Sequence, residues 1–120
     1  HHPSYIDFFE QVLADTTDPA EIEKKWEKQF AEDEWYKHLY RTSYAYHGAH
    51  PFYMWYWGAH ALQHLGRVIV VGGDTAAVRR MGFQPASTLQ DALEMSTDVV
   101  GPQPTITHLK NPPILMADVT

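Results

Sequence analysis

The spacing of apolar residues predicts that the first third of the chain is helical. Residues 3–14 form the first expected helix, whose buried stripe is Ile6, Phe9, Val12 and Leu13. Asp18-Pro19-Ala20-Glu21 is a strong helix start, because Asp caps the N-terminus, Pro suits the first helical position and Glu follows the cap by three residues. We expect this second helix to run to about residue 31 and to bury Ile22, Trp26 and Phe30.

Residues 32–50 have no clean period, and we expect a short helix there followed by a long connection. Pro51 then opens an aromatic helix that Gly66 ends. Residues 51–65 hold five aromatic side chains and two histidines. At roughly 100° per residue these positions divide into two arcs. The arc predicted to face the core is Phe52, Trp55, Ala59, Leu62 and Leu65. The arc predicted to meet a ligand, a metal or another domain is Tyr53, Trp57, His60 and His64.

The second half of the chain has the pattern of alternating strands and helices. Residues 67–71 are a continuous β-branched run, which predicts a strand buried on both faces of a parallel sheet. Gly72-Gly73-Asp74 is then a tight turn into a short helix over 75–81, with Asp74 as its cap. Ser87 is expected to cap a helix over 88–99, and residues 105–109 and 114–116 are expected to be strands. The apolar stripe of the 88–99 helix is Leu89, Ala92, Leu93, Met95 and Val99.

These elements predict the α/β class, with a layered, Rossmann-like parallel sheet of few strands flanked by helices. We expect one domain over residues 1–120, with a helical part over 1–50 and an α/β core over 51–120. Two or three strands are few for the helices present. The pattern therefore favours an incomplete fragment of a larger layered domain, or a chain that borrows a strand at an open sheet edge, as in a homo-oligomer.

Charge and composition exclude several classes of partner. The net charge is −6, and the first 40 residues carry ten acidic side chains against four lysines. The chain has no basic patch, so we expect no nucleic-acid partner. It also lacks a long apolar run and a basic, apolar leader, so we expect neither a membrane span nor a signal peptide. Cysteine is absent, which fits a reducing compartment, and we expect a cytoplasmic protein. His1 and His2 fit equally a tag remnant and native residues.

The histidine pattern allows a metal site without requiring one. His60 and His64 have the i, i+4 spacing that lets two imidazoles reach one ion. A third ligand is needed, and His47, His50 and Asp74 are the nearest candidates. Ordinary half-buried helices often carry histidines at this spacing, so the metal site is the weaker interpretation. No nucleophile and base with a recognisable spacing occur, and we expect no catalytic residue in this chain.

Five segments in the second half of the chain resemble the C-terminal domain of the nickel-pincer lactate racemase family. They are WGAHAL at 57–62, GRVIVV at 66–71, MGFQPA at 81–86, STLQDAL at 87–93 and TIT at 105–107. The passage from Met81 to Leu93 is the most specific. The resemblance covers most of residues 51–109, and HPSYIDFFEQVL near the N-terminus is also similar to a family segment.

The resemblance implies a two-domain racemase or epimerase of 2-hydroxy acids with a cleft between the domains. In that family the N-terminal domain carries the nickel pincer nucleotide and the acid and base histidines. This chain is then the non-catalytic C-terminal domain, which binds no cofactor and is inactive by itself. Its implied partners are the N-terminal catalytic domain of the same protein and a small 2-hydroxy acid.

Two residues are implied to line the substrate side of that cleft. Trp57 matches a tryptophan of the family, and His60 stands where the lactate enzyme has a glutamine. This difference favours a 2-hydroxy acid other than lactate. Two alternatives stay open from the residues alone: a histidine-based metal-binding module, and a protein-interaction domain whose aromatic face binds a partner.

Overall fold

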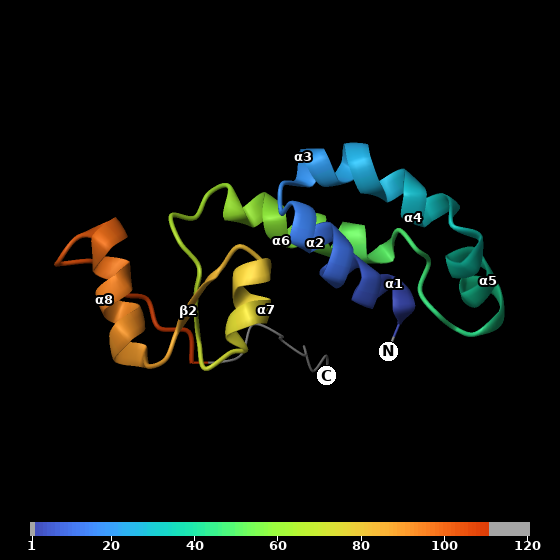
Figure 1. The fold of residues 1–120 in the computed structure, drawn as a ribbon. Coiled ribbons are helices and arrows are strands. Elements are labelled where there is room, and N and C mark those ends of the chain that lie inside the picture. The colour runs from blue at the N-terminus through green and yellow to red at the C-terminus, as the bar shows by residue number, and fades with distance from the viewer. Residues whose placement is uncertain (1, 111–120) are drawn as a thin grey trace, which may run out of the picture.

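The computed structural model describes residues 2–110, which form a helical part followed by a small α/β part (Figure 1). The helical part contains every element from residue 3 to residue 62, and the α/β part extends from residue 69 to residue 100. The molecule is elongated, because its radius of gyration is 17.6 Å whereas a compact chain of this length has about 14 Å. In the described part of the chain, no helix is long and apolar enough to cross a membrane.

The first helix is continuous but contains a π-helical turn. It consists of α1 (Pro3–Asp7), η1 (Phe8–Val12) and α2 (Leu13–Asp15). A π turn has i→i+5 hydrogen bonds, so it rotates the side chains away from the directions of a regular α-helix. The buried positions become Ser4, Phe8, Val12 and Leu13. The prediction that Ile6 is buried was therefore wrong, and Phe9 is only partly buried.

The second helix begins where the sequence predicted and buries the predicted side. It consists of α3 (Pro19–Ile22), η2 (Glu23–Glu27) and α4 (Lys28–Glu32), again with a π turn in the middle. The Asp18 carboxylate accepts a hydrogen bond from the backbone N–H of Glu21, as expected of a cap. Ile22 and Phe30 are buried, and Trp26 is partly buried beside them.

A short helix and a connection lead to the aromatic helix, as predicted. Helix α5 spans Glu34–Thr42 and α6 spans His50–Leu62. The connection packs tightly at Gly48, where an added Cβ would lie only 2.1 Å from the Phe30 carbonyl oxygen. Glycine is thus required at residue 48 because the backbone of the connection approaches the end of α4 too closely for any side chain.

The hydrophobic core lies between α6 and the first and second helices of the chain. Phe52 is fully buried at its centre, and its ring contacts Phe8 and Phe30 edge-on, with centroids 4.8 and 5.0 Å apart. Trp55 and Ala59 continue the buried side of α6, and the Trp55 indole N–H donates to the carbonyl of Thr17. The predicted core arc is therefore confirmed at these positions, but Leu65 follows the helix and is exposed.

The α/β part contains two short parallel strands joined by a helix. Strand β1 spans Ile69–Val71, α7 spans Thr75–Arg80 and β2 spans Gln84–Ala86. Ile69 is paired with Gln84, and Val71 with Ala86. Strand β2 was not predicted, because Gln84-Pro85-Ala86 has neither β-branched nor aromatic residues. In the turn between β1 and α7, the Asp74 side chain caps the helix by accepting a hydrogen bond from the backbone N–H of Ala77, as expected.

The α/β part is much less buried than predicted. Val71 is 44% exposed, and Ile69 and Val70 are half-buried, so β1 is not covered on both faces. Helix α8 (Leu89–Val100) packs against both strands but has no buried residue. In the predicted stripe of this helix, Leu89, Leu93 and Val99 are exposed.

Three further boundaries differ from the prediction or fall outside the structure. Thr88, not Ser87, caps α8, in a capping box with Asp91. Residues 105–109 have no strand partner, so the strand predicted there is absent from the described structure. The strand predicted over 114–116 lies outside the described residues. The coarse α/β class is thus confirmed, with two strands in the described sheet.

Candidate functional site

The side of α6 opposite the core is the surface that the sequence singled out. We call Tyr53, Trp57 and His60, together with His64 in the turn just after the helix, the α6 outer face. All four side chains are exposed, and Trp57 and Tyr53 are 75% and 52% accessible. The same helix buries Phe52, Trp55 and Ala59 on its other side. The outer face is thus an exposed aromatic surface on a helix that is anchored firmly from behind.

Glu27 from the neighbouring helix anchors one side of this face. Its two carboxylate oxygens accept hydrogen bonds from the hydroxyls of Tyr53 and Tyr56, at 3.3 and 2.8 Å. Burial and the Glu27 carboxylate raise the pKa of Tyr56. The charge of Glu27 is the main cause that raises the pKa of Tyr53. Both tyrosines therefore stay neutral donors, and their hydroxyls are fixed toward Glu27.

The two histidines of the outer face lie beside each other without a third ligand. The rings of His60 and His64 are in an edge-to-face arrangement with centroids 5.9 Å apart. His50 lies ten residues earlier on α6, about 15 Å along the helix axis. Asp74 is engaged as the cap of α7. Among residues 2–110, no three His, Asp or Glu side chains are grouped closely enough to hold an ion, so the candidate third ligands are not brought to this pair.

His50 and His47 belong instead to a cluster at the beginning of α6. The Tyr5 hydroxyl and the Nδ1 atom of His50 are 2.5 Å apart, and Tyr46 stacks on the His50 ring at 4.2 Å. His47 accepts a hydrogen bond from the backbone N–H of Ala49. These contacts join the first helix to the connection before α6. They give His50 and Tyr46 a packing role between these two segments.

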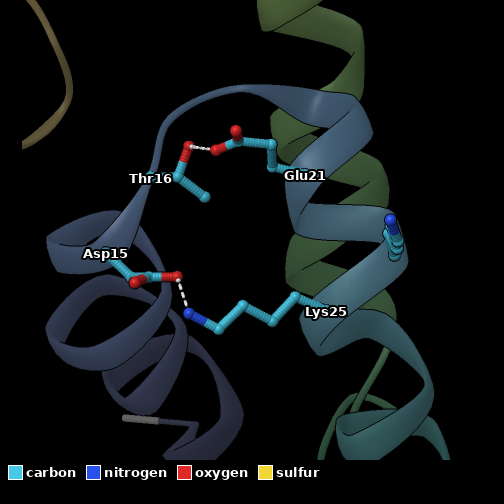
Figure 2. A pocket seen from close by; sticks show the side chains of 5 residues that line it. Asp15, Thr16, Glu21 and Lys25 are labelled. Atoms are coloured by element: carbon cyan, nitrogen blue, oxygen red, sulfur yellow. Dashed lines mark hydrogen bonds and ion pairs between the residues drawn. The ribbon is translucent and has the colours of Figure 1, made fainter.

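A hollow of about 530 Å³ lies on the helical part, at the corner between α2 and α3 (Figure 2). Its lining residues already bind one another, since Lys25 pairs with Asp15 at 2.6 Å and the Thr16 hydroxyl donates to Glu21 at 2.7 Å. The hydrogen bonds from Lys25 and Trp26 hold the pKa of Asp15 below its usual range. We interpret these contacts as a polar clamp between two helices, because four of the five lining residues are paired with one another across the corner.

The side chains of the α6 outer face are of types that can bind a ligand. Indole and phenol rings can stack on a flat or apolar group, and an imidazole can hydrogen-bond to a hydroxyl or a carboxylate. The hydroxyl of Tyr53 on this face donates to the Glu27 carboxylate. Sequence reasoning found all four residues of the face and missed Glu27, which comes from another helix.

Comparisons with known proteins give no relative for this chain. No family model matches it, and neither a curated protein nor a solved structure does.

Proposed function

We propose that this chain is a non-catalytic domain of a nickel-pincer-dependent 2-hydroxy-acid racemase or epimerase. The α6 outer face then forms one wall of the cleft between this domain and the catalytic domain. Two kinds of observation support the proposal: the segments from Trp57 to Thr107 that resemble the family, and the exposure of Trp57. The exposed rings of Trp57 and its neighbour Tyr53 are the observation that carries it, because a patch of exposed aromatic rings on an anchored helix is typical of a surface that contacts a ligand or another domain.

In the proposal, this chain itself holds no part of the nickel cofactor. A pincer complex needs ligands that converge on nickel, whereas His60 and His64 are a lone pair on an open surface. In the proposal the other domain holds the nickel nucleotide and supplies the hydride chemistry. Trp57 closes the substrate side of the cleft and excludes water from it. His60 donates or accepts a hydrogen bond at a polar group of the substrate.

The proposal is tested in the two-domain protein loaded with its cofactor, by measuring racemisation of a panel of 2-hydroxy acids. We expect Trp57→Ala to lower kcat/KM by about tenfold or more, because each lost substrate contact contributes about 1–3 kcal/mol. His60→Gln should change the order of preference among the acids. Trp35→Ala is the matched control, since Trp35 is also an exposed tryptophan but lies on α5.

Two results would contradict the proposal. One is a two-domain protein that racemises no 2-hydroxy acid although the cofactor is bound. The other is equal activity of the Trp57→Ala and Trp35→Ala proteins. The sequence encoded before His1 gives an earlier test, because the proposal requires a preceding domain with a lysine for the cofactor and paired histidines.

A protein-interaction domain is the second candidate, and the exposure of both Tyr53 and Trp57 favours it. In that case the outer face binds a partner protein and no 2-hydroxy acid. Loss of partner binding in Trp57→Ala, together with an inactive two-domain protein, would support this function over the first.

A further inference from the structure

The two strands of the α/β part have edges of different character. The N–H of Gln84 donates to the carbonyl of Val68, and the N–H of Gly72 donates to that of Ala86. In a parallel ladder, alternate residues of a strand bond to opposite sides. The backbone groups of Val68, Val70 and Gly72 therefore face β2. Those of Ile69 and Val71 face the other edge of β1.

The outer edge of β2 is closed to further pairing by Pro85. Gln84 and Ala86 bond toward β1, so the residue between them has its backbone directed outward. That residue is Pro85, which has no N–H to donate. Proline at such a position is typical of the last strand of a sheet. A third strand is therefore expected beside β1, where Ile69 and Val71 offer both N–H and C=O groups.

The positions of the two helices indicate the same edge. Figure 1 shows α7 and α8 on opposite sides of the strands, and α8 contacts both β1 and β2. The crossover through α7 carries the chain from β1 to β2. Crossover connections between parallel strands are right-handed, so two crossovers on opposite faces of a sheet must run in opposite directions across it. The crossover through α8 therefore leads from β2 back past β1. The segment that follows α8 should thus arrive at the free edge of β1.

That segment has the composition and the exposure of a strand without a partner. Residues 105–109 begin four residues after the Gly101 cap position of α8, which is a usual length for a connection in such folds. Thr105, Ile106 and Thr107 are β-branched, which favours a strand. Ile106 and Leu109 are 71% and 80% exposed. Two parallel strands alone are also less than a stable sheet needs.

We infer that the free edge of β1 is a docking site for residues 105–109 of the same chain. The segment adds as a third parallel strand and gives the order β2, β1, 105–109. This order makes β1 the central strand, in keeping with its continuous apolar run. It also brings His108 to the carboxyl end of the sheet, beside the Gly72-Gly73-Asp74 turn. Small ligands bind at such a crevice in open parallel sheets, where the strand order reverses.

The test is residue-resolved amide exchange on the 120-residue chain and on three proline variants, Ile106→Pro, Thr107→Pro and His108→Pro. Docking predicts that the amides of Ile69 and Val71 exchange at least about tenfold more slowly than in the unfolded chain. In the docked segment, only every second residue directs its backbone N–H toward β1. Proline substitutions at neighbouring positions should therefore differ in whether they remove a hydrogen bond to β1. Either Thr107→Pro alone, or both of the other two variants, should abolish that protection.

The amide of Val70, which bonds to β2, serves as the internal control, and protected amides in α6 show that each variant is folded. Unprotected Ile69 and Val71 amides in the parent chain would overturn the inference, as would three prolines of equal effect. Protection that depends on protein concentration would overturn it too, because the added strand would then come from a second copy of the chain.

Discussion

The helical part and the α/β part of this chain differ in how their apolar side chains are used. In the helical part, aromatic rings from three helices meet around Phe52, which is fully buried. In the α/β part, Val78 and Ala86 are the buried apolar residues among those described, and α8 buries none. The difference shows that the first part has a core of its own. The second part offers apolar surface that still requires a cover.

The parts touch at a small junction. Arg80 of α7 forms an ion pair with Glu10, and its guanidinium lies over the Phe9 ring. Met81 packs against the core of the helical part. Because these contacts are few and partly exposed, substitutions in one part should have limited effects on the other. The following predictions test this comparison, beginning with the largest expected effect.

Removing the centre of the aromatic core should destabilise the protein strongly. Phe52→Ala is expected to lower the free energy of unfolding by about 3–5 kcal/mol, because it deletes a fully buried ring that touches Phe8 and Phe30. Leu93→Ala, in the half-exposed face of α8, should lower it by about 1 kcal/mol or less. Urea unfolding followed by circular dichroism measures both. Equal losses would show that α8 is as well packed as the core.

Alanine substitutions at two glycines should have opposite effects on stability, because one glycine lies at a close backbone contact and the other on an open helix surface. Gly48→Ala should destabilise the helical part by about 1–3 kcal/mol, because its Cβ would overlap the carbonyl oxygen of Phe30. Gly58→Ala should stabilise α6 by about 0.5–1 kcal/mol, since nothing lies within 4 Å of the added carbon and alanine favours a helix. The same unfolding measurement applies. A destabilising Gly58→Ala would mean that the outer side of α6 is covered in solution.

Alkaline pH should weaken the helical part alone. Burial, with hydrogen bonds to Asp7 and Glu27, raises the pKa of Tyr36 and Tyr56 above the ordinary value. As the pH rises, the tyrosines therefore lose their protons in the unfolded chain before they lose them in the folded one. Their contribution to the free energy of unfolding is fully present below pH of about 10 and is lost as the pH rises toward the pKa of the folded state. No tyrosine follows residue 56, so the α/β part lacks this dependence.

The tyrosine prediction is checked by repeating the unfolding measurement from neutral to alkaline pH. Combining Tyr36→Phe with Tyr56→Phe should flatten the decline above pH of about 10. Tyr40→Phe should leave the decline in place, because the partly buried Tyr36 and Tyr56 both remain. A decline that persists unchanged in the double variant would assign it to other groups.

The sequence predicted best where local chemistry is decisive. The Asp18 and Asp74 caps, the buried Ile22 and Phe30, and the exposed Trp57 and His60 all follow from spacing and capping within one helix. It failed at Ile6 because a π turn changes the helical period, which no propensity signals. It missed β2 because Gln84-Pro85-Ala86 gains its strand conformation from pairing with β1. It missed Glu27 because that carboxylate reaches the tyrosines from another helix.

The sequence by itself thus determined which segments are helices and which side of α6 is exposed. Those features depend on residues three or four positions apart, whose geometry the helix sets. Only the tertiary structure decided that His47 and His50 lie away from His60 and His64, that Glu27 fixes Tyr53 and Tyr56, and that Pro85 blocks one edge of the sheet while β1 leaves the other open. These relations join residues that are far apart in the chain, and they follow from how whole elements pack rather than from any local preference.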